Sequence, residues 1–271
     1  MLFDTHAHFD AREGEQGYVA LLERARAAGV SRVLAVGGGQ TMNSVALQAA
    51  AEFPDLVRAA VGLDRDAAGE LGASPMAMRR AVDDVMRQIR GAGGAVAALG
   101  EIGLDFHYCP ETAEAQVALL RDQLRAARFL ELPVVIHSRN ADVATLAELR
   151  AHAAEWPGAP ERIGVLHCFT EGEAFARDVL ALGFHIGFSG IVTFHNADSL
   201  RAVAATIPAE RLLLETDTPY LTPIPLRGRR NEPAFVRHVA ETLARVRGTS
   251  AEELARLTAA NADRLFCITV R

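Results

Sequence analysis

Residues 3–8 read FDTHAH, directly after the first two residues of the chain. In an extended strand, side chains two positions apart point to the same face, so His6 and His8 would lie together there. Two imidazoles on one face form a pair of metal ligands, but polar residues at the frayed start of a strand fit the same letters equally well. The stretch also bears on the fold, because a doubly wound sheet would carry a glycine-rich phosphate loop at this point, and FDTHAH is not one.

Short apolar runs alternate with amphipathic segments along the whole chain. Most runs are bounded by glycine, proline or polar residues, as the buried strands of a parallel sheet are. They predict strands at 2–6, 32–37, 57–63, 96–101, 133–137, 163–167, 184–188 and 211–216. Ser250 and Glu253 have the spacing of a capping box at the start of a helix. Helical periodicity predicts helices that include 15–29, 77–91, 111–131, 232–247 and 250–265.

Eight strands alternating with helices predict an α/β fold, the (β/α)8 TIM barrel, and the length of 271 residues is close to the usual size of about 250. A doubly wound open sheet is the alternative. The glycines at 37–39 follow the second strand, but they lack the spacing of a dinucleotide-binding loop. Because the chain has no internal repeat, low-complexity tract or linker, we expect a single TIM-barrel domain over residues 1–271.

The composition narrows the class of protein and the kind of chemistry. A net charge of −6 argues against a nucleic-acid coat protein, but bound divalent cations would still make a phosphate-binding site positive. No apolar run reaches the roughly 18 residues of a membrane span. The absence of a secretory signal and the three scattered cysteines fit a reducing cytosol, so we expect a cytoplasmic protein. All 28 basic residues are arginine, which excludes Schiff-base lysine chemistry and a carboxylated-lysine metal bridge.

Ionisable side chains gather where the predicted strands end. In a barrel these positions converge at one mouth, where barrel enzymes have their active sites. Each such residue alone has an ordinary structural role, such as capping a turn. Together they are hard to explain in that way, because buried ionisable groups cost several kcal/mol unless they are paired or bind metal. The set predicts a metal site built from His6, His8, Glu101, His137, His167 and Asp217.

The donor types of this set indicate hydrolytic metal chemistry. Imidazole and carboxylate ligands without thiolate suit a catalytic site for Mg²⁺, Mn²⁺ or Zn²⁺. Six ligands are too many for one tetrahedral ion, so we expect two divalent metal ions, with Glu101 as the bridge because lysine is absent. Two such ions activate a water and stabilise the attacking and leaving oxygens. Asp217 would act as a ligand and as the proton acceptor from that water.

Several longer stretches together resemble one family, the TatD-related metal-dependent deoxyribonucleases of the amidohydrolase-like barrels. The similarity runs from residue 3 to 233, and NADRLF at 261–266 fits the last helix of the family. The matching stretches are FDTHAHFD (3–10), GEIGLDF (100–106), LPVVIHSR (132–139), GVLHCFT (164–170), GFHIGFSG (183–190), LLLETDTPYLTP (212–223) and RGRRNEP (227–233).

The resemblance implies a TIM barrel that hydrolyses DNA phosphodiesters with Mg²⁺ or Mn²⁺, often from the 3′ end. Zn²⁺ or Ni²⁺ would fit the same ligands. It also implies contacts to substrate phosphates from Arg139 and from the loop that contains Arg227 and Asn231, although a solvated basic loop is the alternative. Glu215 would be a catalytic or supporting carboxylate, or else a buried salt-bridge partner of an arginine. Glu101 would be shared by two metal sites, one completed by His6, His8 and Asp217 and the other by His137 and His167.

The chain departs from the family pattern after the third predicted strand. The family usually carries an active-site histidine there, whereas the stretch VGLDRD (61–66) places Asp64 at that position. An ionised carboxylate cannot donate a hydrogen bond to a phosphate oxygen and would repel it. Asp64 would therefore alter the substrate side of the site, add a metal ligand or pair with Arg65.

The leading hypothesis is a two-metal deoxyribonuclease whose substrate is DNA, as single strands or 3′ ends, with no membrane association and no obligate protein partner. One alternative is a metal-dependent hydrolase of a small ester or amide, since related barrels do both with similar ligands. The other is a metal-binding protein with a degenerate site. A metal-dependent nuclease assay with Glu101→Ala and Asp217→Asn discriminates among the three.

Overall fold

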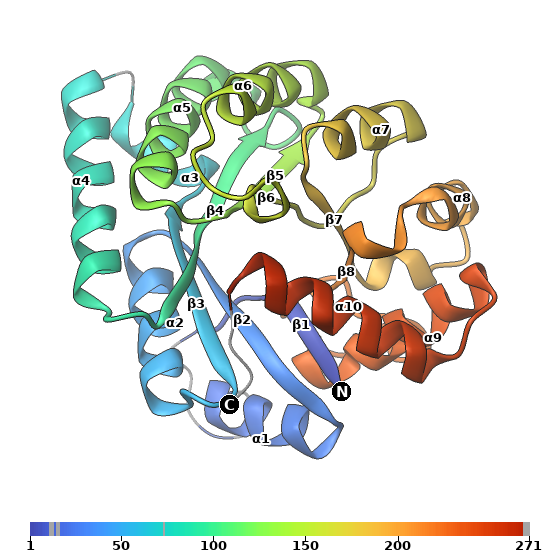
Figure 1. Cartoon of the computed structure of the whole chain (residues 1–271). Helices are drawn as coiled ribbons and strands as arrows, with labels where there is room; N and C mark the ends of the chain where they lie inside the picture. The colour runs from blue at the N-terminus through green and yellow to red at the C-terminus, as the bar shows by residue number, and fades with distance from the viewer. Residues whose placement is uncertain (11–13, 15–16, 73, 268–271) are drawn as a thin grey trace.

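The computed structural model describes residues 1–10, 14, 17–72 and 74–267. Its centre is a parallel sheet in which each strand pairs with the next along the chain. The strands are β1 (Leu2–Ala7), β2 (Val30–Gly38), β3 (Val57–Leu63), β4 (Val96–Asp105), β5 (Val134–Arg139), β6 (Gly164–Leu166), β7 (His185–Phe188) and β8 (Leu212–Leu214). The predicted TIM-barrel fold is confirmed, because eight parallel strands alternate with helices in a nearly closed barrel (Figure 1).

Polar contacts between β1 and the segment after β8 bring the two edges of the sheet together. Ala7 forms a parallel bridge with Thr218, and the Thr5 hydroxyl donates to the carbonyl of Leu214 at 3.0 Å. The buried Asp4 carboxylate accepts the backbone N–H of Thr216 at 2.8 Å and its hydroxyl at 2.7 Å. These hydrogen bonds place the end of β8 beside β1, so residues that follow either strand meet at one mouth.

The helices surround the strands (Figure 1). They are α1 (Tyr18–Ala27), α2 (Gln40–Glu52), α3 (Arg65–Leu71), α4 (Pro75–Gly91), α5 (Ala113–Leu130), α6 (Asp142–Ala154), α7 (Glu173–Ala181), α8 (Asp198–Thr206), α9 (Val236–Arg247) and α10 (Ala251–Leu265). Short 3₁₀ turns lie at η2 (Pro110–Thr112), η3 (Pro160–Arg162), η4 (Gly190–Thr193), η5 (Ala209–Arg211) and η6 (Pro233–Phe235). None of the described helices has the length and hydropathy needed to span a membrane.

The amphipathic pattern of the sequence explains how the outer helices pack. In α4, the buried residues Met78, Val82, Val85 and Ile89 recur at helical spacing and form one apolar face. The predicted capping box at α10 is half realised: Ser250 accepts the backbone N–H of Glu253 at 3.1 Å, while the Glu253 carboxylate accepts the Thr249 hydroxyl instead. Residues 15 and 16, which were predicted to begin the first helix, lie outside the described residues.

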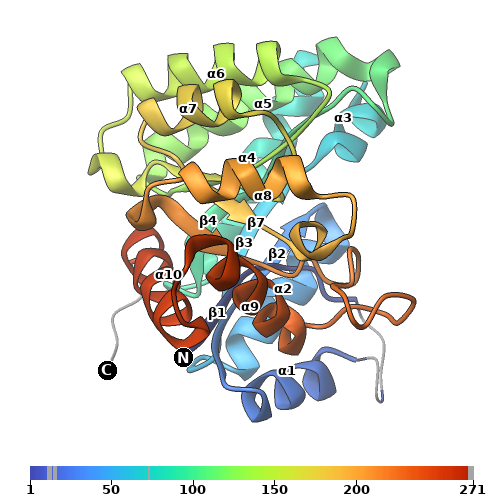
Figure 2. The same ribbon diagram turned by 90° about the vertical axis from the view of Figure 1, so that its right-hand side faces the viewer.

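The last helix, α10, closes the end of the barrel at which the strands begin. Asn261 is buried, and its amide donates to the carbonyls of Ala209 and Leu212 where η5 leads into β8. Phe266 packs with its ring centroid 6.0 Å from that of Phe3 near the start of β1. Figure 2 shows α9 and α10 side by side next to β1. Because α10 covers this end, the opposite end, where the strands finish, is the one that can hold an active site.

One predicted strand end is wrong in a way that matters for the site. β4 does not end at Glu101 but continues to Asp105, because its ladder shifts register after Leu99 and resumes from Ile102 to Asp105 beside β5. Glu101 therefore lies within β4, at the irregularity, and points into the cluster described below. By contrast, β6 and β8 are shorter than predicted, so His167 lies just beyond its strand.

Candidate metal centre

The six residues predicted as metal ligands converge at the mouth of the barrel. They come from β1 and the residue just beyond it, from β4 and β5, and from the segments that follow β6 and β8. Three overlapping groups of potential ligands form there: His6, His8 and Asp217; Glu101, His137 and His167; and His6, His167 and Glu215. Within each group the ligand atoms lie within 4.8 Å of one another.

Glu101 stands between two pairs of histidines, and each of its oxygens faces one pair. Its Oε2 atom lies 3.4 Å from Nε2 of His6 and 3.2 Å from Nε2 of His8. Its Oε1 atom lies 3.1 Å from Nδ1 of His137 and 3.2 Å from Nε2 of His167. One carboxylate thus reaches two separate sets of imidazole nitrogens.

The nitrogens within each pair also face each other. Nε2 of His6 lies 3.0 Å from Nε2 of His8, and Nδ1 of His137 lies 3.3 Å from Nε2 of His167. Neutral imidazole nitrogens and carboxylate oxygens are the ligands that divalent metals of borderline hardness take. Buried donors that converge in this way fit such cations.

Groups behind the histidines lie close to the far nitrogen of three of the four rings. Nδ1 of His8 lies 3.0 Å from the carbonyl of Val36, and Nε2 of His137 lies 3.2 Å from Oδ2 of Asp105. Nδ1 of His167 lies 3.5 Å from Oε1 of Glu215. An acceptor on the far nitrogen holds the ring proton there and leaves the near nitrogen free to bind metal, which is the usual arrangement around ligating histidines.

Asp105 is a site residue that the sequence interpretation missed. It has no exposed surface, and its Oδ1 atom accepts the backbone N–H groups of His107 at 2.9 Å and Tyr108 at 2.8 Å. Its Oδ2 atom faces His137 and also lies 3.5 Å from Nη1 of Arg65. The available signal was an aspartate at the end of the GEIGLD run, but it could not be assigned while β4 was expected to end at Glu101.

Glu215 lies next to the six-residue cluster, beside His167. Besides facing His167, its Oε1 atom accepts the backbone N–H of Cys168. A Cβ atom at position 187 would lie 2.5 Å from Oε2 of Glu215. The glycine at this position of β7 therefore leaves the space that the carboxylate occupies. No arginine pairs with Glu215 among the described residues, which removes the salt-bridge alternative. It lies beside His167, and with His6 and His167 it forms a further group of potential metal ligands.

Asp217 is held in place by its backbone. Its N–H donates to the carbonyl of His6 at 2.9 Å, and its carbonyl accepts the N–H of Tyr220 at 2.8 Å. Its φ of 59° lies in the left-handed region, which aspartate tolerates better than most residues. This turn points Oδ1 of Asp217 at the histidine pair, 3.9 Å from Nε2 of His6 and 3.8 Å from Nε2 of His8.

Burial and mutual charge set the protonation of the cluster. Burial by itself would raise the pKa of Glu101, but the surrounding histidines, His167 first, hold it well below its usual value. Burial, with a contribution from His167, lowers the pKa of His6 well below its ordinary value, so its imidazole is neutral. Burial also raises the pKa of Asp217 to about 6. An ionised carboxylate and a neutral imidazole are the forms that bind metal.

Asp64 has a structural role that its sequence position did not reveal. It is the N-cap of α3, where Oδ1 accepts the backbone N–H of Asp66 at 2.9 Å and of Ala67 at 3.2 Å. The expected pairing with Arg65 does not form, because that arginine pairs with Asp66 and Asp105. Burial, with the nearby charge of Glu101, raises the pKa of Asp64 to about 6. Asp64 is also absent from the groups of potential ligands among the described residues.

The structure separates the three residues predicted to contact substrate phosphates. Arg139 is exposed, with its guanidinium carbon 4.6 Å from the ring centroid of Tyr108. Arg227 is exposed too, and its guanidinium carbon lies 4.0 Å from the ring centroid of Phe194. Asn231 has no exposed surface, which contradicts a direct contact with substrate. Its amide donates to the carbonyls of Thr216 and Tyr220 and holds the segment after β8 in place.

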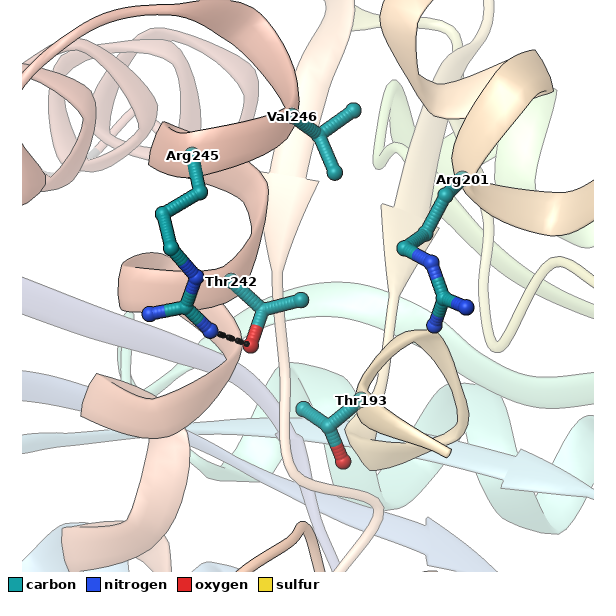
Figure 3. A pocket seen from close by; sticks show the side chains of 5 residues that line it. All are labelled: Thr193, Arg201, Thr242, Arg245 and Val246. Atoms are coloured by element: carbon teal, nitrogen blue, oxygen red, sulfur yellow. Dashed lines mark hydrogen bonds between the residues drawn. The ribbon is translucent and has the colours of Figure 1, made fainter. Parts of the chain in front are cut away.

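A cavity of about 350 Å³ lies away from the metal centre, between α8, α9 and η4. Figure 3 shows the Arg245 side chain turned toward Thr242, to which it donates a hydrogen bond at 3.0 Å. The Arg201 guanidinium on the other side donates to the carbonyls of Val192 and Phe194. Since these cations already have partners within the protein, the cavity offers no free charged group to a ligand.

Comparison with known proteins agrees with this geometry. A family model described as TatD related DNase matches residues 3–267. The chain belongs to the TatD-related DNase family. Its crystallised relatives include the TatD homologue YJJV of Escherichia coli K12, which is 31% identical and superposes with a TM-score of 0.85 over 99% of this chain and 98% of that one.

Two curated relatives carry different descriptions. A protein of Bacillus subtilis (strain 168) named uncharacterized metal-dependent hydrolase YabD is 37% identical over 99% of this chain and 100% of its own. A protein of Erwinia tasmaniensis named 3'-5' ssDNA/RNA exonuclease TatD is 34% identical over 98% of this chain and 99% of its own. This TatD-family member is thus a metal-dependent hydrolase, with histidine, aspartate and glutamate groups that could bind metal.

Proposed function

We propose that this protein is a two-metal phosphodiesterase that removes nucleotides from the 3′ end of single-stranded DNA. The observation that carries the proposal is the position of Glu101, whose two oxygens face two different histidine pairs. A carboxylate so placed suits a bridge between two cations, and two-metal sites are characteristic of phosphodiester hydrolysis. The relative named as a single-stranded DNA and RNA exonuclease supports the substrate class.

The residues divide between the two proposed metal ions as the geometry groups them. His6, His8 and Asp217 would hold one ion together with Oε2 of Glu101, and His137 and His167 would hold the other with Oε1. When bound, two divalent cations acidify a water and neutralise the charge that develops on a phosphate. Mg²⁺ or Mn²⁺ suits the carboxylates, and Zn²⁺ or Ni²⁺ would suit the imidazoles.

The protein's own groups would then position the substrate and move the proton. Asp217 presents Oδ1 to the histidine pair, which leaves Oδ2 to take a proton from the attacking water. Asp105 and Glu215 lie beside the far nitrogens of His137 and His167 and would favour the ring form whose near nitrogen can bind metal. Arg139 and Arg227 are the exposed cations proposed to contact the phosphates that flank the cleaved bond.

A gel assay with 5′-labelled single-stranded DNA and added Mg²⁺ or Mn²⁺ tests this proposal. Wild-type protein should shorten the strand from its 3′ end, and a chelator should stop the reaction. Glu101→Ala and Asp217→Asn should each lower the rate at least 100-fold, since each removes a shared ligand or the proton acceptor. Glu210→Ala, in η5 at the far end of the barrel, is the matched control and should cleave like wild type.

A metal-dependent hydrolase of a small ester or amide is the second candidate. The observation that favours it is Asp64, a further carboxylate close enough to Glu101 for their charges to interact. An additional negative charge beside the site disfavours a phosphate and tolerates a neutral substrate. Turnover of small esters or amides with no cleavage of any oligonucleotide would replace the first proposal by the second. Metal binding without turnover of either class would leave only a metal-binding role.

A further inference from the structure

Two of the three tyrosines of the chain stand exposed beside the metal centre, and no step described above uses them. Tyr108 is 61% exposed and Tyr220 is 63% exposed, whereas Tyr18, the first residue of α1, is buried. A large aromatic side chain in solvent costs hydrophobic free energy, and such side chains are enriched where a partner covers them. Their positions indicate what that partner is.

Tyr108 is fixed to the metal centre through Asp105. Its backbone N–H donates to Oδ1 of Asp105 at 2.8 Å, and Oδ2 of the same carboxylate faces His137 at 3.2 Å. Its ring has Arg139 at 4.6 Å and Arg65 at 5.8 Å from the centroid. A ring in contact with two guanidinium groups, yet still largely open to water, forms a cationic aromatic platform.

Tyr220 has an equivalent relation to the metal centre on the β8 side. It lies three residues after Asp217, as Tyr108 lies three residues after Asp105, and its N–H donates to the carbonyl of Asp217 at 2.8 Å. Its own carbonyl accepts from the buried amide of Asn231. Hydrogen bonds on both sides of the residue hold its backbone, so the exposed ring is presented from a fixed turn rather than from a free loop.

The two tyrosines flank the metal centre from opposite sides. In the barrel order, β4 and β8 are four strands apart, and the two residues follow the C-terminal ends of these strands. The chain of contacts from Asp105 through His137 and Glu101 to the pair of His6 and His8 and then Asp217 runs between them. A strand whose phosphate lies at the metals would pass its bases over these two rings.

We propose that Tyr108 and Tyr220 each stack a nucleobase of a single-stranded substrate, one on either side of the phosphodiester that is cleaved. This rests on the proposed phosphodiesterase function and extends it, because the two residues would select an unpaired strand. Bases in a duplex are already stacked on one another and cannot reach the rings. Base stacking on aromatic side chains is the common way in which proteins hold single strands without reading their sequence.

Steady-state kinetics on two matched oligonucleotides test the stacking. One carries normal bases, and the other has abasic residues at the 3′-terminal positions on the same sugar–phosphate backbone. Tyr108→Ala and Tyr220→Ala should each raise KM about tenfold on the normal strand. Tyr108→Phe and Tyr220→Phe should retain the wild-type KM, because the ring and not the hydroxyl stacks. On the abasic strand, all five proteins should have the same KM.

Phe129→Ala is the matched control, since Phe129 is 70% exposed on α5 and stacks with Arg90 away from the mouth. It should behave like wild type on both strands. If the Ala variants match wild type on the normal strand, the stacking proposal is overturned while the nuclease function stands. If Tyr108→Ala raises KM equally on the normal and the abasic strand, Tyr108 acts through Arg139 on the phosphate, and its stacking role is overturned.

A binding measurement keeps the proposal testable if wild type cleaves no oligonucleotide. A single strand containing 2-aminopurine loses fluorescence when its base stacks on an aromatic ring. Quenching by wild type and by Phe129→Ala, but not by the double variant Tyr108→Ala/Tyr220→Ala, would support the stacking surface although the nuclease proposal had failed. Equal fluorescence with wild type and the double variant would overturn it.

Discussion

At the scale of single residues, the cluster of potential metal ligands can be predicted from the sequence, but the groups that lie behind them cannot. His137 and His167 follow apolar strands in the sequence, and this position suffices to bring them together in any barrel. Their partners depend on contacts between elements. The acceptor for His8 is the backbone carbonyl of Val36, which no residue type reveals, and Asp105 becomes a partner only because β4 continues past its register shift.

Asp105→Asn tests the orienting role of that carboxylate. The amide is nearly isosteric but holds no charge, so it accepts the Nε2 proton of His137 weakly and no longer fixes which nitrogen of the ring is free. We expect Mn²⁺ affinity, measured by titration calorimetry on chelator-treated protein, to fall about 10- to 100-fold. Asp178→Asn, at an exposed ion pair with Arg150, is the control and should bind Mn²⁺ like wild type. Undiminished affinity in Asp105→Asn would show that the ring orientation has another source.

At the scale of elements, the order and type of the predicted helices and strands are confirmed, while several ends are not. Strand ends depend on ladder partners, and the register shift of β4 after Leu99 leaves no mark in the apolar pattern. The short helix α3 (Arg65–Leu71) shows the same limit. Its N-cap is Asp64, a residue whose place in the motif predicts a part of the substrate site.

Asp64→Ala and Asp64→Asn separate the cap from the charge. Alanine removes the acceptor for two N–H groups at the start of α3 and should lower the free energy of unfolding by about 1 kcal/mol. Asparagine keeps an acceptor at the same atom, so its unfolding in urea should stay within about 0.5 kcal/mol of wild type. The variants are compared without metal, which excludes an effect through a bound ion. If asparagine destabilises as much as alanine, the charge and not the cap stabilises α3.

At the scale of the whole molecule, the sequence predicts a barrel but not how its two ends are used. The closing role of α10 follows from Asn261, whose amide donates to the carbonyls of Ala209 and Leu212 across about fifty residues of chain, and no local pattern predicts such a contact. The outer layer likewise encloses polar residues far from the site. His152 of α6 has no exposed surface and packs between Trp156 and Phe184.

Burial of His152 makes the stability of the fold depend on pH. Burial first, and then the charge of Arg128, lower the pKa of His152 from 6.5 to about 4. Between these two values the unfolded chain binds a proton that the folded chain does not, so the stability is complete above pH 6.5 and is lost as the pH falls toward 4. At about 1.4 kcal/mol per pKa unit, this loss is on the order of 3 kcal/mol.

His152→Asn tests this dependence on pH, because the asparagine side chain is polar, similar in length to histidine and does not titrate. With a chelator present, urea unfolding of both proteins is followed from pH 8 to pH 4. The variant should be less stable than wild type at pH 8, since it loses ring contacts with Trp156 and Phe184. The difference should then shrink as the pH falls below 6.5, because only wild type must exclude a proton from this position. A difference that stays constant over the whole range would mean that His152 accepts its proton inside the folded protein as readily as in the unfolded chain.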